Sequence, residues 1–209
     1  MPSSPDSEFN IHHPQPLLIV ISGPSGAGKD TVMQRMQERG LPFFFVVTAT
    51  TRPKRDAEVH GKDYFFVTKE EFAHMIDQDE LIEHAIVYGD YKGIPKQQVR
   101  EALDSGMDVV MRIDVQGAEF VRKMAPDALM IFITTESEAE LVRRLETRKT
   151  ETADSLAIRI ATARKELKRV EAFDYVIVNK DFHLDYTVDM IRAIIDAEHH
   201  RVKPRKVSL

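Results

Sequence analysis

The chain has 209 residues, 43% of them hydrophobic, which is enough for one domain with a sizeable core. Its 29 basic and 34 acidic residues give a formal net charge of −5, which argues against nucleic acid or an anionic membrane surface as the main partner. Cysteine is absent, and this excludes disulfides, thiolate catalysis and cysteine-ligated metals.

The first 16 residues are rich in proline and serine and predict a disordered tail before a domain over residues 17–209. The tail has neither the apolar stretch of a secretory signal nor the arginine-rich pattern of a transit peptide. The longest apolar runs are also much shorter than the about 20 residues that cross a bilayer. We therefore expect a soluble, cytoplasmic protein that binds neither membranes nor nucleic acid.

A glycine-rich loop follows the first predicted strand. The apolar run "LLIVIS" (17–22) is typical of a central parallel strand, and "KDTVMQRMQERG" (29–40) predicts a helix. Where they meet, "GPSGAGKDT" nearly matches GxxxxGK[ST], in which backbone N–H groups bind phosphates and the lysine contacts the terminal ones. A chance glycine turn is a far weaker interpretation in this context. The predicted ATP-binding residues of this segment are Gly23, Pro24, Ser25, Gly26, Ala27, Gly28, Lys29, Asp30 and Thr31.

Asp30 stands where the pattern requires a hydroxyl, which is the group that ligates Mg²⁺. A carboxylate this close to phosphates is repelled by them unless a metal lies between. We expect Asp30 to reach Mg²⁺ directly or through a water molecule, while Thr31 gives its hydroxyl to an ATP phosphate. The alternative is that Asp30 caps the positive end of the helix and faces away from the ion.

Residues 48–94 differ in pattern from the rest of the chain. Short strands and turns surround one helix, which opens with the capping box Thr68-x-x-Glu71. This pattern predicts an inserted α+β subdomain. Arg52 and Arg55 lie on either side of a proline near its start, where they could grip one phosphate; otherwise they form a solvated basic turn.

The other predicted strands alternate with helices, which indicates an α/β fold with a parallel sheet. Asp114, at the carboxyl end of one of these strands, is the kind of carboxylate that lies near the Mg²⁺ of a nucleotide. A capping box at Ser137-x-x-Glu140 and a helix over residues 152–172 predict a charged hairpin, whose arginines could close over a phosphoryl group or pair with its own acids. These strands are residues 43–47, 107–114, 128–133 and 174–178.

Two further patterns carry less weight. "NKDF" at Asn179 begins like the NKxD base-reading element of GTPases, but position 182 holds Phe. The eight histidines include two adjacent pairs, and none has metal-ligand spacing with carboxylates, so we expect surface histidines.

Four ordered blocks resemble the guanylate kinase family, from about residue 17 to residue 200. They are "ISGPSGAGK", "TTRPKRDAEVHGKDYFFV", "RIDVQGA" and "VRRLETRKTE…RIATARKEL", while "GKD" and "YKGIP" are similar to the variant seen in plastids and some bacteria. The resemblance implies the P-loop nucleoside-monophosphate-kinase fold, which has a parallel-sheet core, an inserted α+β GMP-binding subdomain and a helical lid. The core would be residues 17–47, 95–135 and 170–209, the GMP-binding insertion 48–94 and the lid 136–169.

The resemblance also implies roles for individual residues. Glu83 makes chemical sense as the reader of the base, because a carboxylate can accept from guanine N1–H and the exocyclic amine together, whereas adenine has an acceptor at N1. Asn179 would lie near the adenine of ATP. The GMP phosphate would be held by Arg52, Arg55, Tyr64 and Lys92, and the guanine or its surroundings would be read by Thr48, Glu83 and Asp114. The catalytic set would be Lys29, Arg52 and the lid arginines Arg144, Arg148 and Arg159.

The chain departs from the family pattern at three further positions. Lys92 replaces a usual tyrosine ligand of the phosphate, Ile94 replaces a serine that touches the guanine, and Arg112 replaces an acid two residues before Asp114. Lys92 can still meet a phosphate, but Ile94 removes one hydrogen bond to the base. We therefore expect discrimination between bases to depend more strongly on Glu83.

The resemblance implies an enzyme that transfers the terminal phosphoryl group of ATP to GMP, giving ADP and GDP, in purine nucleotide metabolism. Mg²⁺ would enter with ATP, with Asp30 and Asp114 as candidate metal ligands. The alternatives are a kinase for dGMP or AMP, which Ile94 leaves open, and a peptide-binding domain of a scaffold protein. Such scaffold domains typically lose the loop lysine and the lid arginines, and this chain keeps both. Monomer and homo-oligomer are both open at this point.

Overall fold

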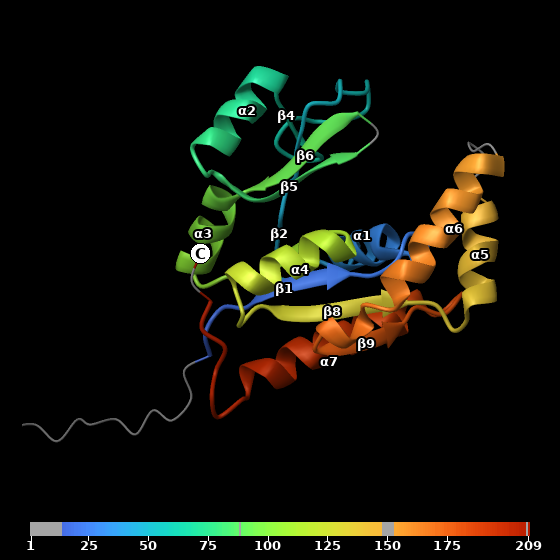
Figure 1. Cartoon of the computed structure of the whole chain (residues 1–209). Coiled ribbons are helices and arrows are strands. Elements are labelled where there is room, and N and C mark those ends of the chain that lie inside the picture. Colours follow the sequence, from blue (N-terminus) through green and yellow to red (C-terminus); the bar gives the residue numbers. More distant parts are fainter. Residues whose placement is uncertain (1–13, 88, 148–152, 208) are drawn as a thin grey trace, which may run out of the picture.

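The computed structural model describes residues 14–87, 89–147, 153–207 and 209. They form two sheets and a helical hairpin: a core sheet, a second sheet above it, and the hairpin beyond one end of the core sheet (Figure 1). The tail expected over residues 1–16 lies outside the described residues as far as residue 13.

The core sheet has five strands in the order β2-β7-β1-β8-β9, and every neighbouring pair is parallel. This arrangement confirms the predicted α/β fold with a parallel sheet. Each predicted strand occurs, although the one expected over residues 43–47 is only two residues long. The strands are β1 (Leu18–Ser22), β2 (Phe44–Phe45), β7 (Val109–Arg112), β8 (Leu129–Thr134) and β9 (Tyr175–Val178).

Helices cover both faces of the core sheet. Successive β1 residues point to opposite faces, so Ile19 and Ile21 pack against one pair of helices, and Leu18 and Val20 against another. All four side chains are fully buried, which is why the sequence of β1 is continuously apolar. The first pair is α1 (Lys29–Glu38) and α7 (Leu184–His199), and the second is α3 (Lys96–Asp104) and α4 (Val115–Met124).

The second sheet has the strand order β4-β3-β6-β5 and mixes parallel and antiparallel pairs. The helix α2 (Lys69–Asp77) packs on it through Phe72, whose ring centroid lies 5.3 Å from that of Tyr91. The capping box predicted at Thr68 and Glu71 is formed at the start of α2. The strands are β3 (Ala49–Thr50), β4 (Phe65–Phe66), β5 (Leu81–Val87) and β6 (Asp90–Pro95).

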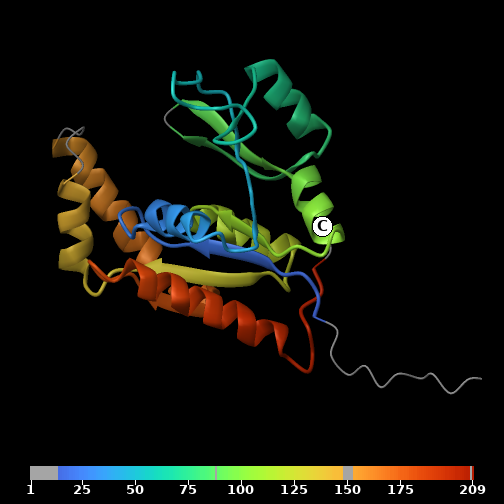
Figure 2. The same ribbon diagram turned by 180° about the vertical axis from the view of Figure 1, so that it is seen from behind.

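The helices α5 (Glu138–Glu146) and α6 (Ala153–Leu167) form a hairpin with its own small apolar core, which includes Leu141, Leu145 and Ala163. The hairpin stands at one end of the core sheet in both views (Figure 2). Half of the predicted capping box is formed: Ser137 accepts a hydrogen bond from the backbone N–H of Glu140, whereas the Glu140 carboxylate binds Arg143 and Arg144. The second helix ends earlier than expected, at Leu167, and a short 3₁₀ turn (Val170–Ala172) follows it. Within the described part of the chain, no helix combines the length and apolar character needed to cross a membrane.

Candidate active site

The glycine-rich loop joins β1 to α1 at the end of the core sheet. Gly23 has φ 138°, and a Cβ atom there would lie 2.0 Å from the carbonyl oxygen of Ile133 on β8. Gly28 has φ 87°, and its Cβ would lie 2.4 Å from Nδ2 of Asn179. Side chains are therefore excluded at both positions by backbone conformation and by space. The two glycines let the loop pack directly against the ends of the neighbouring strands.

Asn179 supports the glycine-rich loop through a side-chain hydrogen bond to its backbone. Its side-chain amide donates to the carbonyl oxygen of Ala27 at 3.0 Å, and its amide oxygen accepts from the hydroxyl of Thr187 at 3.1 Å. The side chain is buried, so both bonds are made away from water. Asn179 was expected near the adenine of ATP, and the structure places it as a support for the loop backbone.

Lys29 is the first residue of α1, and its side chain turns back over the loop. The Nζ atom donates to the carbonyl oxygens of Gly23 at 2.5 Å and Pro24 at 2.9 Å. Burial lowers the pKa of Lys29 to about 8, although the nearby charges of Glu166 and Asp30 oppose this effect. A bound phosphate would add negative charge beside Nζ and favour the ammonium form. The lysine is thus placed for an anion at the loop.

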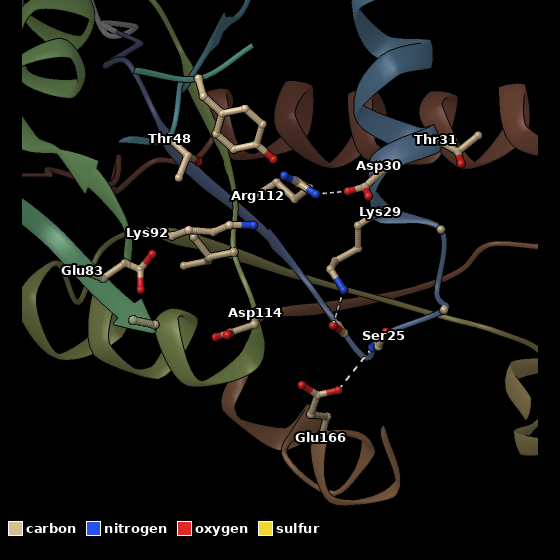
Figure 3. A pocket seen from close by; sticks show the side chains of 16 residues that line it. Ser25, Lys29, Asp30, Thr31, Thr48, Glu83, Lys92, Arg112, Asp114 and Glu166 are labelled. Carbon is tan, nitrogen blue, oxygen red and sulfur yellow. Dashed lines mark hydrogen bonds and ion pairs between the residues drawn. The ribbon is translucent and has the colours of Figure 1, made fainter. Parts of the chain in front are cut away.

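A cavity of about 340 Å³ opens in front of the loop, between the core sheet and the second sheet. It brings together side chains from the loop, α1, β7, the second sheet and α6 (Figure 3). Most of the residues expected to bind either nucleotide therefore share one space. Its polar lining comprises Ser25, Lys29, Asp30, Thr31, Thr48, Tyr64, Glu83, Lys92, Arg112, Asp114 and Glu166.

Glu83 and Asp114 form the acidic wall of this cavity. Asp114 caps α4 by accepting a hydrogen bond from the backbone N–H of Gly117 at 2.7 Å. Gly117 also leaves room for Glu83, since a Cβ at this position would lie 3.1 Å from Oε2 of that carboxylate. Burial, and secondarily the charge of Asp114, raise the pKa of Glu83 to about 7. The pair offers carboxylate oxygens to a ligand that brings N–H donors.

The expected ligands of the GMP phosphate lie on the second sheet, around Tyr64. The guanidinium of Arg52 lies 5.4 Å from the centre of the Tyr64 ring, and the Nζ atom of Lys92 lies 5.7 Å from it. Tyr64 and Lys92 line the cavity. Arg52 instead binds the carboxylate of Glu58 at 2.7 and 3.1 Å, and Glu58 also accepts from the backbone N–H of Arg55. Glu58 thus occupies the guanidinium of Arg52 and the backbone N–H of Arg55, two residues that were expected to hold a phosphate.

The lid arginine Arg144 is also held by acids. Arg144 donates to Glu140 and Asp181 and to the carbonyl oxygen of Asn179, each at 2.7–2.8 Å. Its side chain lies at the back of the loop, outside the cavity lining. Arg159 lies on α6, and Arg148 falls outside the described residues. The structure therefore keeps Arg144 out of the cavity lining.

At position 30 the structure shows a partner that the sequence did not suggest. The carboxylate of Asp30 forms an ion pair with the guanidinium of Arg112, the last residue of β7. Figure 3 shows Asp30 directed to Arg112, with Thr31 pointing away from Lys29. Ile94, expected near the base, is fully buried in the core cluster that also contains Ile82.

Comparison with known proteins identifies the family. The guanylate kinase family model matches residues 15–198. The chain belongs to the guanylate kinase family. Guanylate kinase 2, chloroplastic/mitochondrial, from Oryza sativa subsp. japonica is 55% identical over 197 residues, which are 94% of this chain and 69% of the relative. A guanylate kinase from Clostridium tetani is 45% identical over 193 residues, or 92% of this chain and 91% of the relative.

Among solved structures, the guanylate kinase from Anaplasma phagocytophilum superposes with a TM-score of 0.72 at 32% identity, covering 91% of this chain and 90% of that one. The resemblance drawn from the four sequence blocks is thus confirmed. Membership of the guanylate kinase family also confirms that the protein is a kinase of the P-loop class.

Two residues of this guanylate kinase site were not expected from the sequence as parts of it. Glu166 on α6 accepts a hydrogen bond from the backbone N–H of Ser25 at 3.2 Å, and burial raises the pKa of its carboxyl group. Arg112 was noted only as a departure from the family pattern. Glu166 lies in a helix rich in charges, so its sequence context gave no signal that it turns into the cavity.

The described residues do not form a protein cage for a metal. Among them, no three Asp, Glu or His side chains lie close enough together to hold an ion. Asp30 is paired with Arg112, and one oxygen of Asp114 binds Gly117. Mg²⁺ usually keeps several waters and is bound largely through nucleotide phosphates. The site therefore fits a metal that arrives with ATP, and the carboxylate at position 30 is engaged by Arg112 in this structure.

Proposed function

We propose that the protein transfers the terminal phosphoryl group of ATP to GMP, giving ADP and GDP. The observation that carries this proposal is the shared cavity, in which Lys29 of the phosphate-binding loop faces the acidic pair Glu83 and Asp114. The cavity thus has the ammonium group of Lys29, which suits phosphates, on one side, and two carboxylates that can accept hydrogen bonds from a base on the other. Its two sides match the two substrates of a nucleoside monophosphate kinase.

On the ATP side, the loop binds phosphates through backbone N–H groups, and the start of α1 adds the positive end of a helix. Lys29 neutralises charge on the terminal phosphates as the phosphoryl group moves. The protein forms no covalent bond to the substrate, so its contribution is to position the two nucleotides and stabilise the charge. Mg²⁺ bound with ATP would neutralise phosphate charge, and Asp114 in the cavity lining is the carboxylate that would hold it.

On the GMP side, ionised Glu83 accepts hydrogen bonds from N1–H and the exocyclic amine of guanine. Adenine would place a lone pair against the same carboxylate, so AMP is disfavoured. Thr48 and Asp114 lie beside this position in the cavity lining. Tyr64 and Lys92 receive the phosphate of GMP from the side of the second sheet.

Arg52 and Arg55 join the phosphate when it displaces Glu58 from them. The contact between Arg52 and Glu58 is a pair of charge-assisted bonds, which a phosphate can replace bidentately. The lid arginines Arg144, Arg148 and Arg159 complete the site when the hairpin α5–α6 closes over the transferring group. Both sets would then surround one phosphoryl group.

The test is an ADP-release assay with ATP and Mg²⁺ against GMP, dGMP and AMP. We expect turnover with GMP to exceed turnover with AMP by at least about a hundredfold in kcat/KM, because adenine presents a lone pair at N1 where guanine presents an N–H donor to Glu83. Comparable turnover with AMP would contradict the base assignment. The absence of ADP release with every monophosphate would favour the scaffold-type domain instead.

A further inference from the structure

Asp30 and Arg112 come from two elements that meet beside the loop. β7 runs parallel to β1, with Arg112 in register with Ile21, so it ends next to the start of the loop. Asp30 is in the first turn of α1, directly after Lys29. The two side chains form an ion pair, and both line the cavity in front of Lys29 (Figure 3). Arg112 is also one of the charges that lower the pKa of Lys29, as expected of a nearby cation.

These are the two positions through which P-loop proteins hold Mg²⁺. A Ser or Thr hydroxyl after the loop lysine ligates the ion, and an Asp at the end of a neighbouring strand supports it. Here the hydroxyl position holds Asp30, and the end of the strand beside β1 holds Arg112. The usual pair carries net negative charge and attracts a cation. In this chain the two charges cancel, and a guanidinium occupies the space.

The guanidinium remains accessible to a second ligand. Asp30 binds one of its terminal nitrogen atoms, and arginine has further N–H donors in a rigid planar group. The side chain of Arg112 is 35% exposed, and its exposed part faces the cavity. Ion pairs this exposed contribute little to folding stability. The clearer consequence of the pair is that a fixed cation points into the space that receives phosphates.

We propose that Arg112 binds the phosphates of ATP and that Asp30 is the positioning residue that holds Arg112 in place. Arg112 supplies at this corner the positive charge that a loop-ligated Mg²⁺ supplies in other P-loop proteins, so the metal would be held mainly by ATP. This inference rests on the proposed function, because it assumes that ATP occupies the loop.

The experiment measures ATP binding by calorimetry without GMP, in EDTA and again with Mg²⁺. Arg112→Gln should weaken binding of metal-free ATP about tenfold or more, which corresponds to about 1.4 kcal/mol, and leave GMP binding unchanged. The matched control is Arg35→Gln, since Arg35 on α1 makes the same kind of ion pair, with Asp185, and is 36% exposed. Thermal unfolding of each variant checks that it is folded.

Two more variants separate positioning from simple repulsion. Asp30→Asn removes a negative charge near the phosphates, yet it should weaken the binding of metal-free ATP, because Arg112 loses its support. The double variant Asp30→Ser/Arg112→Asp restores the usual metal-holding pair. It should bind metal-free ATP poorly. The ratio of its ATP affinity with Mg²⁺ to its affinity without Mg²⁺ should be about ten times the same ratio in the wild type.

Any of three results would overturn this inference and leave the proposed function standing. The first is that Arg112→Gln binds metal-free ATP as tightly as Arg35→Gln, and the second is that Asp30→Asn binds it more tightly than the wild type. The third is that Arg112→Gln weakens the binding of GMP as much as the binding of ATP. A wild-type protein that binds no ATP in either condition would overturn the proposed function and this inference together. The two failures are therefore distinguishable.

Discussion

The backbone N–H of Ser25 donates a hydrogen bond to the carboxylate of Glu166, 3.2 Å away, and so connects the phosphate-binding loop to α6. A carboxylate is a modest substitute for a phosphate, since both are anions that accept from N–H groups. Glu166 therefore occupies one of the loop donors in the structure described here. ATP must displace it in order to use the same donor.

Replacing Glu166 with Gln should tighten ATP binding about threefold to tenfold at pH 8, because the amide carries no charge to compete with phosphate. Burial raises the pKa of Glu166, so lower pH protonates the wild-type carboxyl and should reduce the difference between the two proteins. Calorimetric titration with ATP at pH 8 and pH 6 measures both effects. Glu138→Gln on α5 is the control, since Glu138 binds Arg164 on the surface of the hairpin. Weaker ATP binding by Glu166→Gln would show that this contact shapes the loop.

Replacing Lys29 with Met should lower kcat by about a thousandfold and leave the fold intact. The ammonium would stabilise charge in the transition state, whereas its hydrogen bonds within the described part of the chain are to two loop carbonyls, those of Gly23 and Pro24, and to no residue of the hydrophobic core. Steady-state ADP release and a thermal melt measure the two quantities. Lys165→Met on α6 serves as the control for loss of a lysine. A Lys29→Met enzyme that kept more than about a tenth of wild-type kcat, a loss under about 1.4 kcal/mol, would show that this loop is not the catalytic one.

Replacing Glu83 with Gln should reduce the preference for GMP over AMP by about tenfold to a hundredfold in kcat/KM. The Gln side chain has one acceptor and one donor group, so it cannot accept from both guanine donors and no longer repels adenine N1. The ratio of the two kcat/KM values is the measurement, with Glu70→Gln on the exposed face of α2 as the control. Unchanged selectivity would move base recognition to other residues.

The same substitution should stabilise the free protein in a pH-dependent way. The pKa of Glu83 is about 7 in the fold and 4.5 without it, so between these values the folded protein binds more protons at this site than the unfolded chain. Ionised Glu83 therefore lowers the free energy of unfolding above pH 7, and this cost disappears as pH falls toward 4.5. Glu83→Gln should raise the free energy of unfolding by about 1–2 kcal/mol at pH 8 and leave it nearly unchanged at pH 5. Urea titrations at both values measure it; an equal gain at both would point to packing.

ATP and GMP together should draw the second sheet and the hairpin α5–α6 toward the core sheet. Arg52 and Arg144 are held by Glu58 and by Glu140 and Asp181, outside the cavity lining, whereas the proposed function requires both to reach one phosphoryl group. Small-angle scattering should give a smaller radius of gyration with both nucleotides than with either alone. A bisubstrate mimic that joins the two nucleotides would prevent turnover during the measurement. Identical scattering curves in all states would contradict closure.

Features set by nearby residues could be predicted from the sequence, and features set by distant ones could not. The apolar strand, the glycine loop and the cap at Thr68 each depend on a few consecutive residues, and the structure contains all three. The partner of Asp30 lies 82 residues away, and Glu166 reaches Ser25 across 141. Neither contact has a local signal, because any exposed helix in a charged chain carries similar side chains.

The arginines of the insertion and of the hairpin α5–α6 also have partners that could not be predicted from the sequence. The sequence identified the arginines as a group, but Arg52 and Arg144 are bound to acids that the motif does not include. These acids come from neighbouring turns and helices, where acidic residues are common and their direction depends on the fold. Residue identity thus predicted the chemistry of the site, whereas its state before substrates bind required the three-dimensional structure.

The missing side chain of Gly26 has a mechanical consequence. A Cβ at this position would come within 3.2 Å of both Leu141 and Leu145, so the core of the hairpin rests directly on the loop backbone. The hairpin therefore packs against the same peptide units that the proposed function assigns to the phosphates of ATP. A side chain at position 26 would separate the hairpin from the loop. Any shift of the loop backbone on binding ATP would therefore be felt first by Leu141 and Leu145.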